Sequence, residues 1–265
     1  MLRLTTGVIL GLGWLLLLLK GSVLAFWLVL LAIVAVLLRE FCHMTMGDFS
    51  NRDRVSVIIL GLLPVAAAYQ GTPAAINGGT LLAILLLFLH ILNIYSQRQD
   101  ALKLLLRGVF AIVYLGAFSA HAILIRRFAG GASWMLFLTI VIIASDSGAF
   151  YGGTYFGRHK LCPSISPGKT VEGLFCGVLA GVAGGTLYVH LLNPVPSIPT
   201  ILLLSALLSL TGVLGDLIES IIKRSSGVKD SGTLLPGHGG LFDRLDAILL
   251  CVPVLSSILS SGLFS

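Results

Sequence analysis

Long apolar runs, separated by short polar or Gly/Pro-containing breaks, make up most of this 265-residue chain. A helix needs about 20 predominantly apolar residues to cross the hydrocarbon layer of a bilayer. The pattern predicts nine such helices, of which the first and third are short: 4–19, 22–38, 55–70, 79–95, 108–125, 132–153, 171–190, 199–222 and 246–264. We therefore expect an all-α polytopic membrane protein with about nine transmembrane helices.

The first apolar run also resembles a signal peptide, because Arg3 precedes it and Val23-Leu24-Ala25 follows it. Lys20 interrupts the run before that cleavage-like sequence, however, and a second apolar run starts directly afterwards. A signal peptide has one short apolar region ahead of its cleavage site. We interpret the run as the first membrane helix.

Composition excludes several classes of protein. Hydrophobic residues make up 57% of the chain and charged residues 11%, whereas ordinary soluble domains have about 45–50% and about 25%. A soluble globular domain is excluded, and so is a disordered or nucleic-acid-binding chain, which needs charge; no nucleic acid partner is expected. The four cysteines lie far apart, which argues against structural zinc and a disulfide framework.

Lysine and arginine divide unequally between the two sides of the predicted topology. One side carries 14 of the 17 and the other carries Lys20, Arg126 and Arg127. Cytoplasmic loops are enriched in these residues, so we place the N-terminus in the cytoplasm and the C-terminus outside, in the inner membrane of the cell. The 14 are Arg3, Arg39, Arg52, Arg54, Arg98, Lys103, Arg107, Arg158, Lys160, Lys169, Lys223, Arg224, Lys229 and Arg244.

Acidic residues divide the chain into two regions, N-terminal transmembrane helices over 1–130 and a catalytic transmembrane region over 131–265. The second region holds seven of the eleven acids. It also has glycines at every fourth position of one predicted helix, a face that lets helix backbones approach closely. These glycines, Gly173, Gly177, Gly181 and Gly185, predict either tight packing within the chain or the seam of a homodimer.

The end of the eighth predicted helix is the first candidate site. Asp216, Glu219, Ser220 and Lys223 recur at helical spacing and share one face. A carboxylate on a membrane helix costs about 2.5–3.5 kcal/mol unless it is compensated, and two of them one turn apart favour a bound cation. The simpler alternative is an ion pair between Glu219 and Lys223, which leaves Asp216 unexplained.

Three other segments lie at the same predicted membrane face. The first joins a glycine run at 237–240 to Asp243, Arg244 and Asp246 at the start of the ninth helix, where backbone N–H groups could approach a ligand. A helix-dipole role would account for one of those acids. The others are the stretch 164–173 and Asp146, an acid that could equally be a satisfied buried group.

The stretch 164–173 superficially resembles the end of a Walker A motif, but Pro163 stands where that motif needs glycine. A helix N-terminus with Ser, Lys and Thr nevertheless suits phosphate. The simpler alternative is a helix cap with Ser166 before Pro167 at the first helical position, which leaves Lys169 unexplained. Together, acids, bases and glycines without redox ligands indicate Mg²⁺ and a polyphosphate.

Residues 220–246 closely resemble the signature of phosphatidate cytidylyltransferases, also called CDP-diacylglycerol synthases, and 145–149 and 166–170 are similar to segments of that family. The motif residues are Ser220, Lys223, Arg224, Lys229, Asp230, Pro236, His238, Asp243, Arg244 and Asp246. The resemblance implies CTP and phosphatidic acid as substrates, Mg²⁺ as cofactor and a site facing the cytoplasm. It points to Asp216, Asp243 and Asp246 as the acidic centre.

We accordingly assign roles to the candidate residues. The expected catalytic residues are Asp216, Asp243, Asp246 and Lys223. The expected substrate-binding residues are Ser166, Lys169, Thr170, Arg224, Lys229, His238 and Arg244. The expected metal ligands are Asp216, Asp243, Asp246, Glu219 and Asp146, enough carboxylates to hold a second cation as well.

Two rival functions are compatible with parts of the pattern. A CTP-dependent lipid alcohol kinase would share the membrane setting and the nucleotide, but the complete 220–246 motif argues against it. A cation transporter would use Asp146, Asp216 and Glu219 as an ion pathway. Transporter sites usually lie near the bilayer midplane, whereas these acids are expected at one face.

Overall fold

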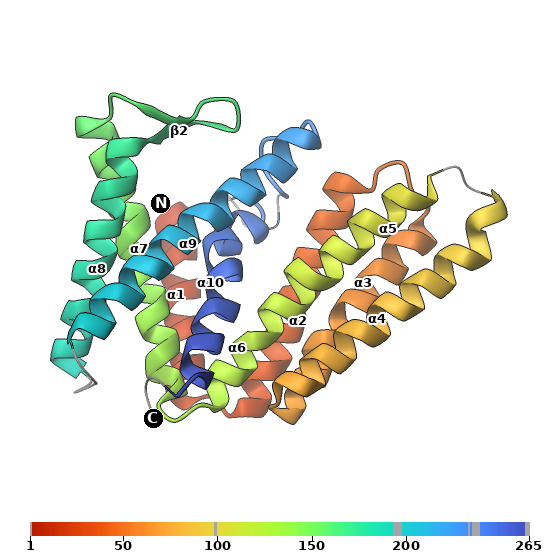
Figure 1. The fold of residues 1–265 in the computed structure, drawn as a ribbon, viewed down its shortest axis with the longest axis horizontal. Helices are drawn as coiled ribbons and strands as arrows, with labels where there is room; N and C mark the ends of the chain where they lie inside the picture. The colour runs from red at the N-terminus through yellow and green to blue at the C-terminus, as the bar shows by residue number, and fades with distance from the viewer. Residues whose placement is uncertain (1, 98–99, 193–197, 233, 235–238, 263–265) are drawn as a thin grey trace. The chain divides into compact units, whose positions relative to one another are not determined.

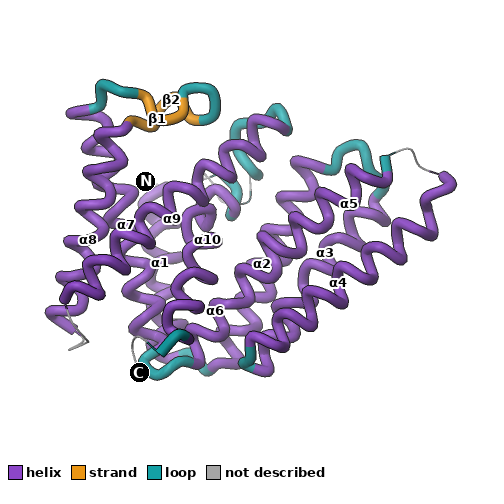
Figure 2. The backbone as a smooth tube through the Cα atoms, viewed as in Figure 1, coloured by secondary structure: helices purple, strands orange, loops and turns teal. Residues whose placement is uncertain are grey.

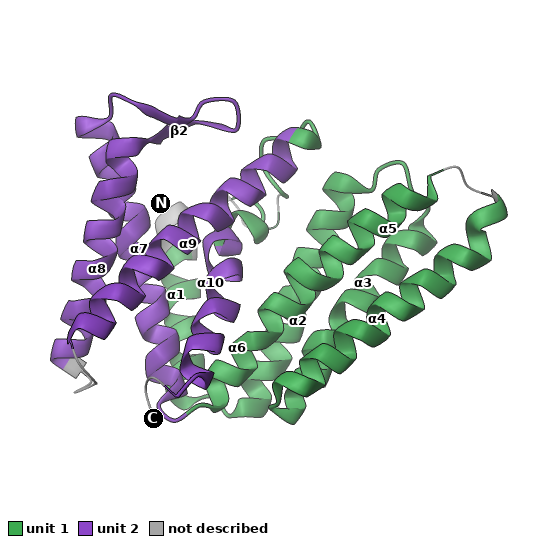
Figure 3. Ribbon diagram, viewed as in Figure 1, with its two compact units in different colours: residues 1–128, 225–244 green, residues 129–224, 245–265 purple. Residues whose placement is uncertain are grey.

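The structure is a computed structural model, and it describes residues 2–97, 100–192, 198–232, 234 and 239–262. The chain forms two compact units, residues 1–128 with 225–244 and residues 129–224 with 245–265 (Figure 3). The predicted division into N-terminal helices over 1–130 and a catalytic region over 131–265 concerns where the chemistry lies, and it stays a prediction.

The first unit is a helical bundle in which α3 contacts α2, α4 and the α5–α6 run (Figure 1). Its helices begin where the sequence supplies caps: the Ser50 hydroxyl and the Asp53 carboxylate form a capping box at α3, and Thr72 caps α4 ahead of Pro73. The elements are α1 (Leu2–Lys20), α2 (Val23–Thr45), α3 (Asn51–Ala67), η1 (Ala68–Gln70), α4 (Pro73–Ile94), η2 (Tyr95–Gln97), α5 (Ala101–Phe110), the π-helix η3 (Ala111–Ala117) and α6 (Phe118–Arg127).

Two of the three basic residues on the predicted outer side bind the ends of neighbouring helices. Arg126 Nη2 donates to the carbonyls of Leu18 and Gly21, at 3.2 and 2.8 Å, where α1 ends. Arg127 Nη2 donates to the carbonyl of Tyr69, at 2.5 Å, in η1. Helix C-terminal carbonyls lack partners within the helix and carry partial negative charge, so cationic side chains stabilise them.

The second unit is built on close contact between α7 (Gly131–Phe156) and α8 (Val171–Leu192). A Cβ added at Gly177 would lie 2.9 Å from the Ser145 carbonyl oxygen, and one at Gly185 would lie 2.9 Å from Val141. The glycine face of α8 is therefore packed against α7 inside the chain, and nothing supports the alternative homodimer seam. α9 (Ile198–Ser225) and α10 (Phe242–Ser260) follow, except that Ser225 and the first three residues of α10, 242–244, belong to the first unit.

The first eight predicted transmembrane segments coincide with a helix or a continuous helical run, and the ninth, 246–264, overlaps α10 and ends beyond the described residues. Among the described residues, seven of these are long and apolar enough to cross a membrane. A helical polytopic membrane protein is thus confirmed, while the count of nine and the sides of the termini stay predictions. The fifth predicted segment, 108–125, is longer than expected, because α5, η3 and α6 continue one another from Ala101 to Arg127.

A short antiparallel hairpin, unpredicted by the sequence, connects α7 to α8 (Figure 2). Its strands are β1 (Lys160–Cys162) and β2 (Ser166–Thr170). The alternative in which Ser166 caps a helix that starts at Pro167 is wrong, because both residues lie in β2 and α8 starts at Val171. The Thr170 hydroxyl takes the capping role and accepts the Gly173 N–H at 3.1 Å.

Candidate active site

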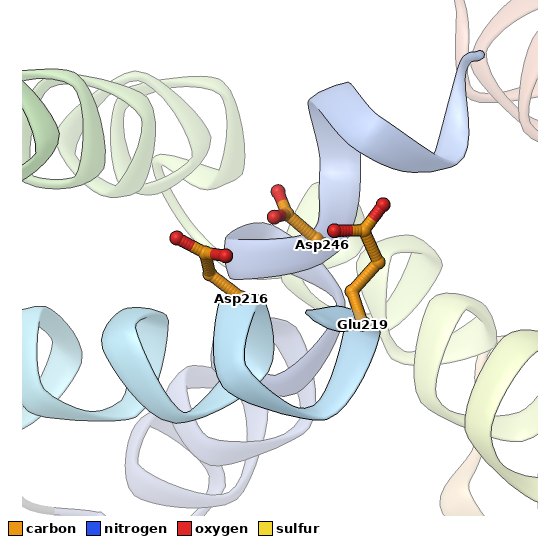
Figure 4. A group of neighbouring side chains, drawn as sticks. All are labelled: Asp216, Glu219 and Asp246. Atoms are coloured by element: carbon orange, nitrogen blue, oxygen red, sulfur yellow. The ribbon is translucent and has the colours of Figure 1, made fainter. Parts of the chain in front are cut away.

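Three carboxylates from two helices of the second unit form the centre of the candidate site. Asp216 and Glu219 lie on α9 and Asp246 lies on α10 (Figure 4). One oxygen from each lies within 4.8 Å of the other two. Oxygen ligands at this spacing suit a hard divalent cation such as Mg²⁺, so these residues could hold one.

Gly215 explains how Asp246 reaches the two acids of α9. A Cβ at this position would overlap the backbone carbonyl of Asp246 and lie 3.2 Å from the Ala247 Cα. A glycine directly before Asp216 therefore lets α10 approach α9 at the level of the carboxylates. Gly212, one turn earlier, also faces Ala247 and Cys251, but a Cβ there would be in ordinary contact with both and close only to Ile142, at 2.8 Å.

Two lysines partly neutralise this acidic centre. Lys223 Nζ lies 2.7 Å from Glu219 Oε2, one turn along α9. Lys169 Nζ lies 2.7 Å from Asp216 Oδ2 and comes from β2. The ion pair between Glu219 and Lys223 is confirmed, yet Glu219 also belongs to the three-carboxylate cluster. The ion pair thus does not exclude the other alternative, a cation bound by Glu219, which stays a prediction.

Hydrogen bonds with Glu172 and Arg224 hold the hairpin that carries Lys169 in place. Glu172, in the first turn of α8, accepts the backbone N–H groups of Arg158 and His159, and one of its oxygens lies 2.6 Å from His159 Nδ1. Arg224 Nε donates to the Ile165 carbonyl at 3.4 Å. These contacts define where Lys169 lies, and sequence analysis assigned no role to Glu172 or His159.

Asp146, on α7, lies outside the three-carboxylate cluster. Asp146 is an exposed residue by its surface area, and its carboxylate lies within electrostatic range of Asp216 and Lys169. The remaining residues predicted for substrate have varied surroundings. Lys229 and Arg244 are exposed, whereas Thr170 is buried by its capping contact; His238 lies outside the described residues.

A second carboxylate network lies in the first unit, around Asp243. Asp243 Oδ2 accepts three hydrogen bonds, from the Ser231 N–H and hydroxyl at 3.0 Å each and from the Gly240 N–H at 2.8 Å. Gly239 adopts φ of 80°, a left-handed conformation that favours glycine. Asp216 and Asp243 thus belong to different units, and a cation shared by both stays a prediction.

Glu40 of α2 is the member of this network that sequence analysis missed. Its carboxylate accepts the N–H groups of Leu241 and Phe242, both at 2.9 Å. Of the glycine run 237–240, where we expected backbone N–H groups to approach a ligand, Gly240 donates to Asp243 within the protein, and 237–238 lie outside the described residues. The available signal was an acidic residue near the end of a mostly apolar helix, beside Arg39, and an acid in a membrane helix normally requires an explanation.

The sequence matches known proteins along its whole length. The model of the cytidylyltransferase family matches residues 1–261. A phosphatidate cytidylyltransferase of Staphylococcus epidermidis is 34% identical over 263 residues, which cover 97% of this chain and 98% of the relative. Proteins of the same name from Bacillus subtilis and Mycobacterium bovis are 41% and 43% identical over 152 and 145 residues, covering 57% and 53% of this chain and 56% and 46% of theirs.

Proposed function

The chain belongs to the cytidylyltransferase family, and we propose on this basis that it transfers the cytidylyl group of CTP to phosphatidic acid, giving CDP-diacylglycerol and pyrophosphate for phospholipid synthesis. Relatives named for this activity match the chain over nearly its full length. The structural observation that best supports the proposal is the cluster of three carboxylates with two lysines paired to them, in a helical membrane protein of this family.

The reaction needs charge control more than a protein nucleophile. A phosphate oxygen of phosphatidic acid attacks the α-phosphorus of CTP, and the bond to the β-phosphate oxygen breaks as pyrophosphate leaves. A phosphate monoester has a second pKa of about 6, so the attacking group is largely dianionic at neutral pH. Two polyanions must therefore meet, and positioning with electrostatic stabilisation supplies most of the catalysis.

Asp216, Glu219 and Asp246 are the residues that we assign to Mg²⁺, because they offer only hard oxygen ligands and lie close enough to share one ion. A bound Mg²⁺ neutralises phosphate charge and polarises the transferred group. We keep Asp243 as a proposed further ligand of the same centre, and Asp146 as a ligand for a second cation.

The lysines beside the acids are assigned to phosphate. Lys169 and Lys223 keep an ammonium group next to the carboxylates, so each can bind an oxygen of a phosphate that approaches the cation. Ser166 and Thr170 flank Lys169 on the hairpin, and Arg224 touches the same hairpin. Lys229, His238 and Arg244 complete the proposed set of phosphate ligands.

The proposed location of the site is the cytoplasmic face, where CTP is available. The excess of Lys and Arg on the loops that carry these residues supports this orientation. Phosphatidic acid would reach the site from the bilayer with its acyl chains among the membrane helices, so that only the headgroup needs to enter the charged region.

The position of the label in CTP tests the proposed reaction against its rivals. Purified protein would be given phosphatidic acid, Mg²⁺ and CTP labelled on either the α- or the γ-phosphate. The proposed reaction moves α-label into the lipid phase and γ-label into pyrophosphate. A lipid alcohol kinase would place γ-label in the lipid, and ion flux in liposomes without CTP would favour a transporter. Either result would overturn the proposal.

A further inference from the structure

Glu40 is a buried carboxylate far in sequence from every group that it binds. It lies near the end of α2, with an exposed fraction of 8%. Oε1 accepts the Leu241 N–H, and Oε2 accepts the Phe242 N–H and the Ser231 hydroxyl, the last at 3.2 Å. A charge removed from water costs several kcal/mol unless it is compensated. Two backbone N–H donors, together with a Ser231 hydroxyl that Glu40 shares with Asp243, therefore indicate that this position is built to hold a carboxylate.

The two backbone donors, Leu241 and Phe242, lie at the start of α10, so Glu40 binds the N-terminus of this helix. Phe242 is the first residue of α10, and the first N–H groups of a helix have no partner within it. The positive end of the helix dipole also favours a carboxylate there. Because each oxygen takes one of two successive N–H groups, Glu40 fixes both the position and the direction of the first turn of α10.

Glu40 and Asp243 are joined through one hydroxyl. Ser231 Oγ lies 3.2 Å from Glu40 Oε2 and 3.0 Å from Asp243 Oδ2. Asp243 is itself the second residue of α10 and also receives the N–H groups of Ser231 and Gly240. A shift of the Glu40 carboxylate would therefore move the residues that surround Asp243.

Two glycines leave the space that the Glu40 carboxylate fills. A Cβ at Gly232 would lie 2.8 Å from Glu40 Oε1, and one at Gly240 would lie 2.7 Å from Glu40 Oε2. Neither glycine has a positive φ, so the requirement at these positions is for space. Gly232 and Gly240 therefore leave room for the Glu40 carboxylate beside Ser231.

We propose that Glu40 is a positioning residue for cytidylyl transfer: it acts through the first turn of α10 and Asp243, and it does not touch substrate. This inference rests on the proposed function. Loss of the carboxylate should leave a folded protein that binds both substrates but turns over slowly, because the acidic residues of α10 no longer lie where the transition state requires them.

The decisive variant is Glu40→Gln, compared with Asp53→Asn. Asp53 is the matched control because it is also a buried carboxylate of the first unit, and it caps α3 and contacts His90 at 3.0 Å. For Glu40→Gln we expect kcat to fall about 10–100-fold, as when outer-shell partners of functional groups are removed, with KM for both substrates near wild type. Asp53→Asn should lower the thermal midpoint without this fall in kcat.

The measurements are kcat, both KM values, the thermal midpoint and amide hydrogen exchange of the peptide around Leu241 and Phe242, which should exchange faster in Glu40→Gln alone. Wild-type kcat in Glu40→Gln, or equal losses of kcat in the two variants, would overturn the proposal. If Glu40→Gln does not fold, kcat of Gly232→Ala tests the positioning role of Glu40 instead. This substitution displaces the carboxylate and keeps its charge, so a fall in kcat supports the inference and an unchanged kcat refutes it. An inactive wild-type protein would instead refute the proposed function.

Discussion

Lys169 Nζ lies 2.7 Å from Asp216 Oδ2, so the hairpin between α7 and α8 places a cation directly beside the acidic centre on α9. The same lysine would oppose a divalent cation and attract a phosphate. Removing its charge should therefore strengthen binding of the divalent cation and weaken binding of the phosphate. Measuring both affinities tests the role of Lys169 more sharply than measuring activity alone.

For Lys169→Ala we expect kcat/KM for CTP to fall about 10²-fold, the scale for removing one preorganised electrostatic partner. The Mg²⁺ concentration for half-activation should fall as well, because the ammonium group no longer repels the metal ion. Steady-state titrations of CTP and Mg²⁺ measure both. Lys103→Ala is the control, since Lys103 is exposed and, among the described residues, forms its ion pair with Asp100 across one turn. Wild-type kinetics in Lys169→Ala would rule out a phosphate role.

Thr170 and Ser166 should differ in their contributions to stability. The Thr170 hydroxyl is buried and caps α8, so Thr170→Ala should lower the free energy of unfolding by about 1 kcal/mol. Ser166→Ala should leave it nearly unchanged, because Ser166 caps no helix. Chemical denaturation in detergent, followed by circular dichroism, compares the two. A larger loss in Ser166→Ala would contradict the capping geometry.

Gly215→Ala should damage both stability and activity. Its Cβ would overlap the Asp246 carbonyl, and forcing an extra group into a packed contact costs about 1–3 kcal/mol. The resulting separation of α9 and α10 would move Asp246 away from Asp216 and Glu219. Gly78→Ala is the control, because nothing lies within 4 Å of a Cβ there. If Gly215→Ala kept full activity, close approach of the helices would not be needed for the site.

The membrane helices were predictable from the sequence because their length and apolarity are local properties. The same is true of Asp216, Glu219 and Lys223, which share one face by helical spacing alone. The hairpin escaped prediction because β1 has three residues, too few for an alternating pattern. Glu40 escaped it because its partner Leu241 lies 201 residues away, and no periodicity encodes such a contact.

Cysteine accessibility tests the predicted orientation. In a variant without Cys42, Cys162, Cys176 and Cys251, a single cysteine replacing exposed Lys229 should resist impermeant thiol reagents in intact cells and react after lysis. One replacing exposed Ala74, in the first turn of α4, should react in intact cells. The reason is the distribution of 14 basic residues on one side and three on the other. The reverse labelling pattern would invert the orientation and move the site outside.

Asparagine substitutions test the acidic centre. Asp216→Asn and Asp246→Asn keep side-chain size but remove a charge and weaken a hard oxygen ligand. Each should lower Mg²⁺-dependent turnover by about 10³-fold, or several kcal/mol of transition-state stabilisation. Chelation of Mg²⁺ should abolish wild-type activity, and returning the ion should restore it. Asp100→Asn is the control, because Asp100 is exposed and its ion pair within the described part of the chain is with exposed Lys103.

The double substitution of Asp216 and Asp243 shows whether residues of the two units serve one ion. If they share Mg²⁺, the double Asn variant should be little slower than the slower single variant, because groups that act as a unit are not additive. If Asp243 acts only by holding Ser231 and Gly240, the two losses should multiply. Turnover of the two single variants and the double variant, measured over a range of Mg²⁺ concentrations, distinguishes these outcomes. Near-wild-type turnover in Asp243→Asn would remove Asp243 from the catalytic centre altogether.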